Sequence, residues 1–295
     1  MNALRDGIGG FARETIKTFK LLARNKMGLF GFVMTLVIVL LSFVGPIIWQ
    51  PETSANVADI NQGPSEKHFL GTDFQGQDNL RKVINGGKDI VITAFLTGII
   101  ATLLAVTVGA FSAFVGGRVD SALMELVNIW MTIPKFPLLA VIATVIKLND
   151  PVTLSLLMAF LDWPGLSRQV RAQVLSLKKR DYIEAATMLD LGTRQIIFRE
   201  ILPNMMSFIA VSTIFTMTFA IYQQTGLVFL GIVPYSGANW GVMISAAERR
   251  GVLYTAAASW SIIAPIGAIV LFQLALISFA RSLEEVFNPR LRTSV

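Results

Sequence analysis

The sequence contains no cysteine and only one histidine, His68. The absence of cysteine excludes disulfide bonds, thiol nucleophiles and metal sites built from thiolates. A single imidazole does not build a metal site by itself, so we interpret His68 as a structural residue. The aspartates of the same region have no cluster of histidine or cysteine beside them: Asp59, Asp73, Asp78 and Asp89. The sequence therefore offers no catalytic constellation and predicts that the chain is not an enzyme.

A phosphate-binding loop is also missing. The pattern G-x-x-x-x-G-K-[ST], whose backbone cradles nucleotide phosphates, occurs nowhere in the chain. The nearest fragment, Gly86-Gly87-Lys88, lacks the first glycine at the required spacing. If the protein takes part in an ATP-driven process, another chain must bind the nucleotide.

Charged residues are scarce, at 15% of the chain, whereas soluble domains carry about a quarter. Hydrophobic residues make up 54%, and the mean hydropathy is +0.62. A helix of about 20 apolar residues crosses a hydrocarbon core of about 30 Å. Charge is absent from four segments and interrupts two more only once or twice: 27–51, 90–117, 201–247 and 251–280, then 123–146 and 152–166.

These segments predict an all-α, polytopic membrane protein with about six transmembrane helices. The run 201–247 holds one span and then a loop, because turn residues cluster at 231–239. The fourth predicted helix is the weakest, since Pro164 and Gly165 interrupt it. Lysines and arginines concentrate in the loops that are cytoplasmic if the N-terminus lies inside, so we predict that both termini are cytoplasmic. This topology accounts for most of the net charge of +6 without nucleic-acid binding.

The predicted parts are an N-terminal cytoplasmic segment 1–26, a first transmembrane helix 27–50, an extracytoplasmic segment 51–89, a core 90–282 with a cytoplasmic loop 178–204, and a cytoplasmic tail 283–295. The segment 51–89 is too polar to insert into a bilayer and too long for a tight turn. We expect it to form an outer lobe, with a simple spacer as the alternative. The basic residues from Arg168 to Arg180 are interpreted as a consequence of topology and of contact with lipid headgroups, and the alternative is that they position the cytoplasmic loop or contact acidic groups of a partner.

The cytoplasmic loop contains the stretch YIEAATMLDLGTRQIIFREILPN, residues 182–204. Its pattern predicts two short helices joined by a tight turn. Gly192 suits a helix C-terminal position with positive φ, Thr193 suits the cap of the second helix, and Pro203 ends it. Apolar contacts are expected from Ile183, Met188, Ile196, Ile197 and Ile201. The hairpin either presents an apolar knob to a partner or lies on the headgroups as an interfacial connection.

The same stretch resembles a known motif. Glu184-Ala185-Ala186, followed by a glycine and then by Leu202-Pro203, is similar to the EAA loop of permease subunits in binding-protein-dependent ABC importers. Two departures are visible. Asp190 stands where the family usually has its glycine, which appears two residues later as Gly192. Glu200 stands where the family has an isoleucine, with Ile201 one place on.

Further motifs extend the resemblance over nearly the whole chain. The segment ARNKMGLFGFVMTLVIVLLSFVGPII resembles the N-terminal helix of the C-type subunits of dipeptide, oligopeptide and nickel permeases. HFLGTDFQGQDNLRKVINGGKDI, FLGIVPYSGANWGVMI and FNPRLR are similar to three later motifs of those subunits, in the same order.

The resemblance implies the transmembrane domain of a type I ABC importer in the inner membrane of a prokaryote. Its implied partners are two ATPase subunits that bind ATP and Mg²⁺, a second permease of the B type, an extracytoplasmic solute-binding protein and membrane lipid. This chain itself would hold no cofactor. The residues that it implies for coupling to the ATPase are Tyr182, Glu184, Ala185, Ala186, Asp190, Gly192, Arg194, Leu202 and Pro203.

The expected cargo is a peptide or a polar solute of similar size, delivered by the binding protein. The alternative within the same importer type is an oligosaccharide. A channel or a secondary transporter is the alternative from another class, and it would function without an ATPase. That class would leave the EAA-like hairpin unexplained.

Polar residues within the apolar segments are candidates for the translocation path, because such residues are costly in a bilayer. Lys135, in the third predicted helix, can line the path, pair with Glu125 or Asp162, or extend toward the membrane surface. The glutamines of the fifth predicted helix can line the path or form hydrogen bonds between helices. The candidates for the path are Thr132, Lys135, Tyr222, Gln223 and Gln224.

Overall fold

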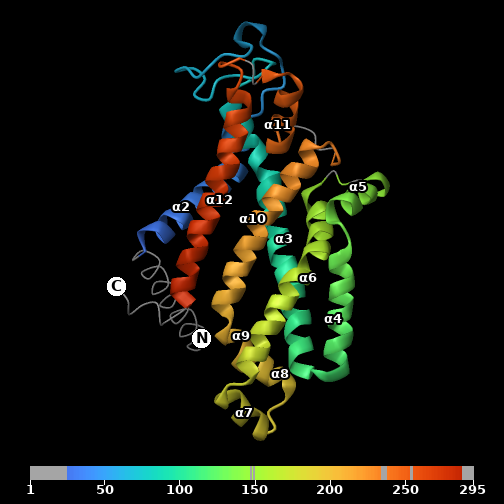
Figure 1. Cartoon of the computed structure of the whole chain (residues 1–295). Coiled ribbons are helices and arrows are strands. Elements are labelled where there is room, and N and C mark those ends of the chain that lie inside the picture. The colour runs from blue at the N-terminus through green and yellow to red at the C-terminus, as the bar shows by residue number, and fades with distance from the viewer. Residues whose placement is uncertain (1–24, 147, 149, 234–237, 253–254, 288–295) are drawn as a thin grey trace, which may run out of the picture.

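The computed structural model describes residues 25–146, 148, 150–233, 238–252 and 255–287. The predicted all-α class is confirmed, since the elements of the described residues are helices. The described residues also contain one isolated antiparallel bridge, between Thr72 and Asp78. Most of the long helices run along one axis, and loops and several short helices gather at its two ends (Figure 1).

Within the described parts of the chain, four helices are long and apolar enough to cross a membrane: α2 (Lys26–Ile48), α3 (Asn79–Val115), α10 (Met206–Phe229) and α12 (Trp260–Phe287, of which 260–284 qualify). Long charge-free sequences form these helices because every backbone N–H and C=O must be paired inside the bilayer. Helix α3 begins well before residue 90, within the predicted outer segment. Asp78 caps it by accepting a hydrogen bond of 3.0 Å from the backbone N–H of Arg81.

The third predicted helix is broken in two. Helix α4 (Gly117–Thr132) and helix α5 (Lys135–Val145) qualify as a span only together, and they are bent by 80°. The break lies at Ile133 and Pro134. A proline disfavours the helical conformation of the residue before it, and Ile133 is extended, with φ −76° and ψ 123°. Lys135 is therefore the first residue of α5 and Thr132 the last residue of α4, so these two path candidates do not lie in one continuous helix.

The fourth predicted helix, α6 (Pro151–Lys178), is continuous. The prediction that Pro164 and Gly165 interrupt it was wrong. A proline inside a helix removes one backbone donor, and neighbouring helices at membrane depth stabilise such a helix. Helix α6 packs along the length of α3. It is not among the spans that qualify by composition, so four or five spans meet that test while all six predicted segments form helices.

Helices α2 and α12 pack together in opposite directions. Gly28 lies against Ser282, and Gly31 against Phe279, so close that a Cβ at either glycine would overlap its neighbour. Gly45, near the other end of α2, lies against Ile84 of α3. The beginning of α2 and the end of α12 therefore lie at the same end of the bundle.

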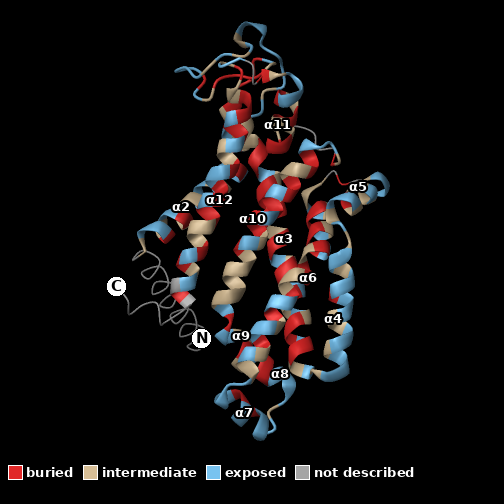
Figure 2. Ribbon diagram, viewed as in Figure 1, coloured by how far each residue is buried: buried red, intermediate tan, exposed pale blue. Residues whose placement is uncertain are grey.

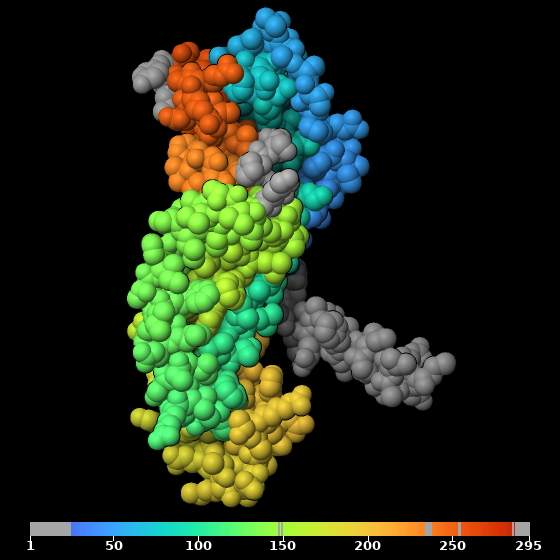
Figure 3. Space-filling model, turned by 90° about the vertical axis from the view of Figure 1, so that its right-hand side faces the viewer, coloured from blue at the N-terminus to red at the C-terminus, as the bar shows by residue number. Residues whose placement is uncertain are grey.

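Two segments lie at opposite ends of the molecule in both views (Figures 1 and 3). Residues 181–204, called the hairpin below, follow α6. Residues 50–78, called the lobe below, connect α2 to α3 and contain one short 3₁₀ helix, Val57–Asp59. Helix α11 (Trp240–Arg249) lies at the lobe end, where the Trp240 indole N–H donates to the carbonyl of Val83 at 2.7 Å.

Burial follows the surfaces that the helices share (Figure 2). One core cluster joins α3, α10, α11 and α12 around Phe272. A second cluster joins α3 and α6 to the hairpin and to the residues just before α10. Helix α2 exposes most of its large apolar side chains, as expected of a helix that faces lipid.

Candidate functional site: the hairpin and the central hollow

The hairpin contains the two helices that the sequence predicts, joined by a turn at a different residue. Helix α7 (Asp181–Met188) ends before Asp190, which has φ 52°. Gly192 has φ −56°, so the prediction of a positive φ there was wrong. Aspartate enters the left-handed region more readily than most residues, because its short polar side chain tolerates it. Asp190 thus has the positive φ that the sequence predicts two residues later, at Gly192.

The second half of the hairpin is helical throughout, and a π-helix lies between two short α-helical segments. It consists of α8 (Thr193–Gln195), a π-helix (Ile196–Ile201) and α9 (Leu202–Asn204). The cap before α8 is Gly192, and Thr193 is its first residue, so the predicted cap at Thr193 was wrong. A π-helix holds more residues per turn than an α-helix and often occurs at functional sites.

The base of the hairpin is part of the bundle core. Ile183, Ala186, Ile196 and Ile201 are buried, and they pack in one cluster with Val170 and other apolar residues of α3 and α6. The predicted apolar contacts at these isoleucines are therefore contacts within the chain. Ala186 faces this core, whereas its neighbour Ala185 is exposed.

The outer surface of the hairpin exposes large apolar side chains. Met188 is 86% exposed, Leu189 74% and Phe198 62%, and Tyr182 is also exposed. We call these four side chains the exposed apolar set. The other predicted coupling residues are placed as follows: Glu184, Asp190, Gly192, Arg194 and Pro203 are exposed, and Leu202 is half-buried.

Two basic residues of α6 form contacts with neighbouring helices close to the hairpin. The Arg171 guanidinium donates two hydrogen bonds to the Asp120 carboxylate, at 2.6 and 2.5 Å, and Asp120 also accepts from Ser112. The Lys178 ammonium donates to the carbonyl of Phe114 at 2.8 Å and lies 5.2 Å from the centre of that ring. These two basic residues hold α3, α4 and α6 together, in addition to any role in topology.

Lys135 forms an ion pair with Asp162 of α6, with 2.7 Å between Nζ and Oδ1. Of the predicted alternatives for Lys135, pairing with Asp162 is confirmed. The Asp162 side chain is only 5% exposed and that of Lys135 is 37% exposed. The pair lies in a hollow of about 400 Å³, called the central hollow below. It is lined by Lys135, Asp162, Gly165, Leu166, Gln169, Ser212, Phe215, Thr216 and Phe219.

The other predicted path residues are divided between the outside and the inside of the bundle. Tyr222 is 58% exposed, and it follows Phe215 and Phe219 along one face of α10 at helical spacing. Gln223 and Gln224 are buried. Thr132 is exposed, and its hydroxyl donates to the carbonyl of Ile129 at 2.7 Å. Sequence reasoning missed the two phenylalanines, although their spacing of four residues was a usable signal.

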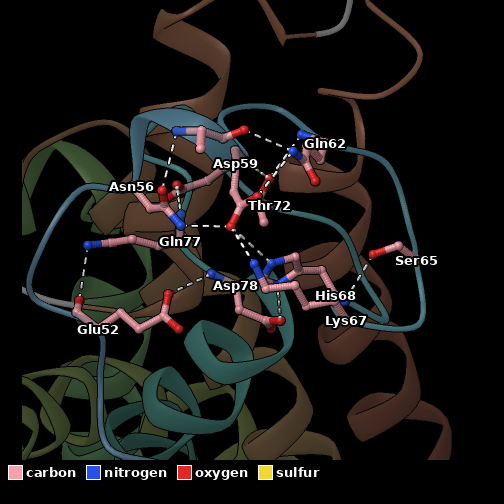
Figure 4. A network of polar contacts seen from close by, with 12 residues as sticks. Glu52, Asn56, Asp59, Gln62, Ser65, Lys67, His68, Thr72, Gln77 and Asp78 are labelled. Atoms are coloured by element: carbon pink, nitrogen blue, oxygen red, sulfur yellow. Dashed lines mark hydrogen bonds and ion pairs between the residues drawn. The ribbon is translucent and has the colours of Figure 1, made fainter.

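The lobe is held together by polar contacts (Figure 4). His68 is buried, with Nδ1 2.8 Å from the Asp78 carboxylate and Nε2 3.6 Å from that of Asp59. Lys67 donates to Asp59 at 2.8 Å, and this hydrogen bond lowers the pKa of the Asp59 carboxyl below its usual value. Gln77 donates to the carbonyl of Glu52 at 3.0 Å. These contacts fit the interpretation of His68 as structural, and the described residues contain no cluster of metal-ligand side chains.

The fold and this site define a class of protein: a multi-pass helical membrane protein with a hairpin anchored in its core at one end and an ion pair in a hollow between its helices. Residues 101–293 match the family described as binding-protein-dependent transport system inner membrane component, and the chain belongs to this family. Residues 15–64 match the N-terminal transmembrane domain of oligopeptide transport permease C. The chain is therefore a multi-pass inner membrane permease subunit of a prokaryotic ABC importer, and ATP hydrolysis belongs to another subunit of that complex.

Curated relatives cover nearly the whole chain. A putative peptide permease protein of Brucella suis is 32% identical over 270 residues, which are 90% of this chain and 88% of that protein. The oligopeptide transport system permease protein OppC of Bacillus subtilis is 28% identical over 270 residues, 91% of this chain and 87% of that protein. OppC of Mycobacterium tuberculosis strain H37Rv is 30% identical over 268 residues, 88% of this chain and 91% of that protein.

Proposed function

We propose that this chain moves peptides across the inner membrane as one of two permease subunits, the other being of the B type. Two ATPase subunits that bind ATP and Mg²⁺ drive the movement, and an extracytoplasmic binding protein delivers the cargo. Relatives named as peptide and oligopeptide permeases support peptide cargo. They give no support to an oligosaccharide.

The observation that carries this proposal is the construction of the hairpin. Its inner side is fixed in the bundle core by Ile183, Ile196 and Ile201, while the exposed apolar set lies on its outer side. An exposed apolar surface of this kind marks a contact with another molecule. Because the base is packed, a force applied to the exposed set moves α3 and α6 with it. The hairpin thus has the form required of a rigid coupling element between an ATPase and the bundle.

An ATPase subunit can shift the equilibrium between two forms of the bundle only if it interacts differently with those two forms. In this proposal the ATPase subunits close on ATP and displace the hairpin, and the bundle changes between inward-open and outward-open forms. Glu184 and Ala185 of α7 and Arg194 of α8 are exposed on the hairpin. In this proposal they contact the ATPase. Ala186 acts differently, because it is buried and keeps the hairpin close to the bundle.

The face of the bundle that contains the central hollow supports a path for polar solutes. Ionisable side chains at membrane depth nearly always face the bundle interior or a water-filled cavity, because exposure to lipid is costly. Lys135 is partly exposed on the face formed by α5, α6 and α10. This face is therefore directed toward the second permease subunit, and the path runs between the two subunits.

Native mass spectrometry of the tagged chain, purified in mild detergent from its own host, tests the proposal. We expect an ATPase and a second permease to accompany it. Met188→Glu places a charge in the exposed apolar set and should release the ATPase while the second permease stays bound. Val57→Glu is the matched control, because Val57 is 80% exposed in the lobe and its replacement should release neither subunit. A chain that is isolated alone under these conditions, or a Met188→Glu variant that keeps its ATPase, contradicts the proposal.

A further inference from the structure

The Lys135–Asp162 pair has hydrogen-bonding capacity that the chain does not use. An ammonium group has three donors, and among the described residues the Lys135 ammonium donates only to Asp162 Oδ1. Asp162 Oδ2 is buried and has no hydrogen-bond partner among the described residues. A buried carboxylate oxygen without a partner is costly, so it marks a position where a donor is expected.

The surroundings of the pair are suited to a solute with charged ends and an apolar body. The central hollow has a volume of about 400 Å³, within the range of about 300–1,000 Å³ that is usual for small-molecule sites. Gln169 and Ser212 add polar groups to its lining. Phe215 and Phe219 are 55% and 54% exposed and supply apolar surface. Their positions in α10 place the hollow near the middle of the span.

The two partners of the ion pair differ in access. A solute that enters the hollow meets Lys135 first, because its side chain is 37% exposed and that of Asp162 only 5%. A carboxylate that binds Lys135 replaces one carboxylate contact by another of the same kind, but it leaves Asp162 in need of a new cation, because an unpaired buried charge is costly. A solute whose own ammonium group pairs with Asp162 meets this need, so that the complete exchange changes the free energy little. A transit site requires this property, since a solute that binds too tightly does not leave.

We propose that the central hollow is a transit site for peptides with free termini, an inference that rests on the peptide cargo proposed above. Lys135 binds the terminal carboxylate of the peptide in exchange for Asp162. Asp162, with Oδ1 released and Oδ2 unpaired, accepts from the terminal ammonium of a short peptide. The phenylalanines of α10 contact its apolar side chains.

The test uses the complete importer in proteoliposomes, saturated with its binding protein, and compares a tripeptide that has a free C-terminus with the same tripeptide as its C-terminal amide. The measured quantity is the import rate of the tripeptide with the free C-terminus divided by the import rate of its amide. Any preference of the binding protein is common to all permease variants and cancels when these ratios are compared. We expect Lys135→Met to lower the ratio by about tenfold, the value of one charge-assisted hydrogen bond, while import of the amide persists.

Removal of Lys135 alone leaves Asp162 buried without a counter-charge, which can prevent folding. The double variant Lys135→Met with Asp162→Asn removes both charges, and it should show the same loss of preference. Lys88→Met is the control, because Lys88 is an exposed lysine of α3 outside the hollow and its loss should leave the ratio unchanged. A normal ratio in an assembled double variant overturns the transit site. Failure of the wild-type importer to take up any peptide instead refutes the peptide cargo itself.

Discussion

The hairpin and the lobe are both short connections beyond the ends of long helices, and different interactions hold them. The hairpin is fixed by buried isoleucines and exposes large apolar side chains. The lobe buries His68, Asp78 and other polar groups, and hydrogen bonds to carboxylates join its loops (Figure 4). Apolar packing makes the hairpin stiff and insensitive to salt and pH, which suits the transmission of force. The polar network of the lobe responds to both, because its contacts depend on charge.

The largest expected effect concerns the buried apolar contacts that fix the hairpin. Ile196→Ala removes a fully buried side chain from the base of the hairpin, and it should lower the free energy of unfolding by about 2–5 kcal/mol. Phe198→Ala, two residues later on the exposed side, should change it by less than about 0.5 kcal/mol. Denaturant unfolding of the purified chain in detergent measures both. Equal effects of the two variants would contradict the assignment of an inner and an outer side.

Two adjacent alanines distinguish the buried side of the hairpin from its exposed side. Ala186→Leu adds volume to a packed core and should cost about 1–3 kcal/mol of stability. Ala185→Leu adds the same atoms on the exposed side, so stability should be unchanged while coupling of ATP hydrolysis to transport falls. The ratio of ATP hydrolysed to peptide imported reports the second effect. If Ala185→Leu left this ratio unchanged in a fully assembled complex, Ala185 would not lie at the ATPase contact.

The polar side of the comparison is tested at Asp78. Asp78→Ala removes the partner of His68 Nδ1 and the cap of α3, and should destabilise the lobe by about 1–2 kcal/mol. Hydrogen exchange should rise in residues 50–78 and stay unchanged in residues 181–204. A change in exchange at both ends of the molecule would show that the lobe is not an independent polar unit.

The smallest expected effect is a dependence of the lobe on pH. The hydrogen bond from Lys67 lowers the pKa of Asp59 below its usual 3.8, so its contribution to stability is present above that value and is lost as pH falls through the lowered pKa. Lys67→Met should remove this contribution. The difference in lobe exchange between wild type and Lys67→Met, measured at matched pH, should therefore shrink from pH 5 to pH 3. A difference that grows on acidification would contradict the stated sign.

The long helices and the two-helix hairpin were predictable, since apolar runs in a bilayer must be helical and the turn chemistry of the hairpin is local. The partner of Lys135 was not decidable, because the choice between Glu125 and Asp162 depends on how α5 and α6 pack. The break before Pro134 had a signal in the proline itself. The difference in burial between Ala185 and Ala186 follows from helical periodicity, since Ala186 lies one turn after the buried Ile183.

The π-helix at Ile196–Ile201 determines which side chains of the hairpin face the bundle. Residues five places apart lie on different sides of an α-helix, which has about 3.6 residues per turn, whereas the i→i+5 bonds of a π-helix bring them to the same side. Ile196 and Ile201 are five places apart, and both are fully buried. The wider turn therefore lets the hairpin pack into the core at both ends of this segment, where a regular α-helix would turn one of the two isoleucines outward.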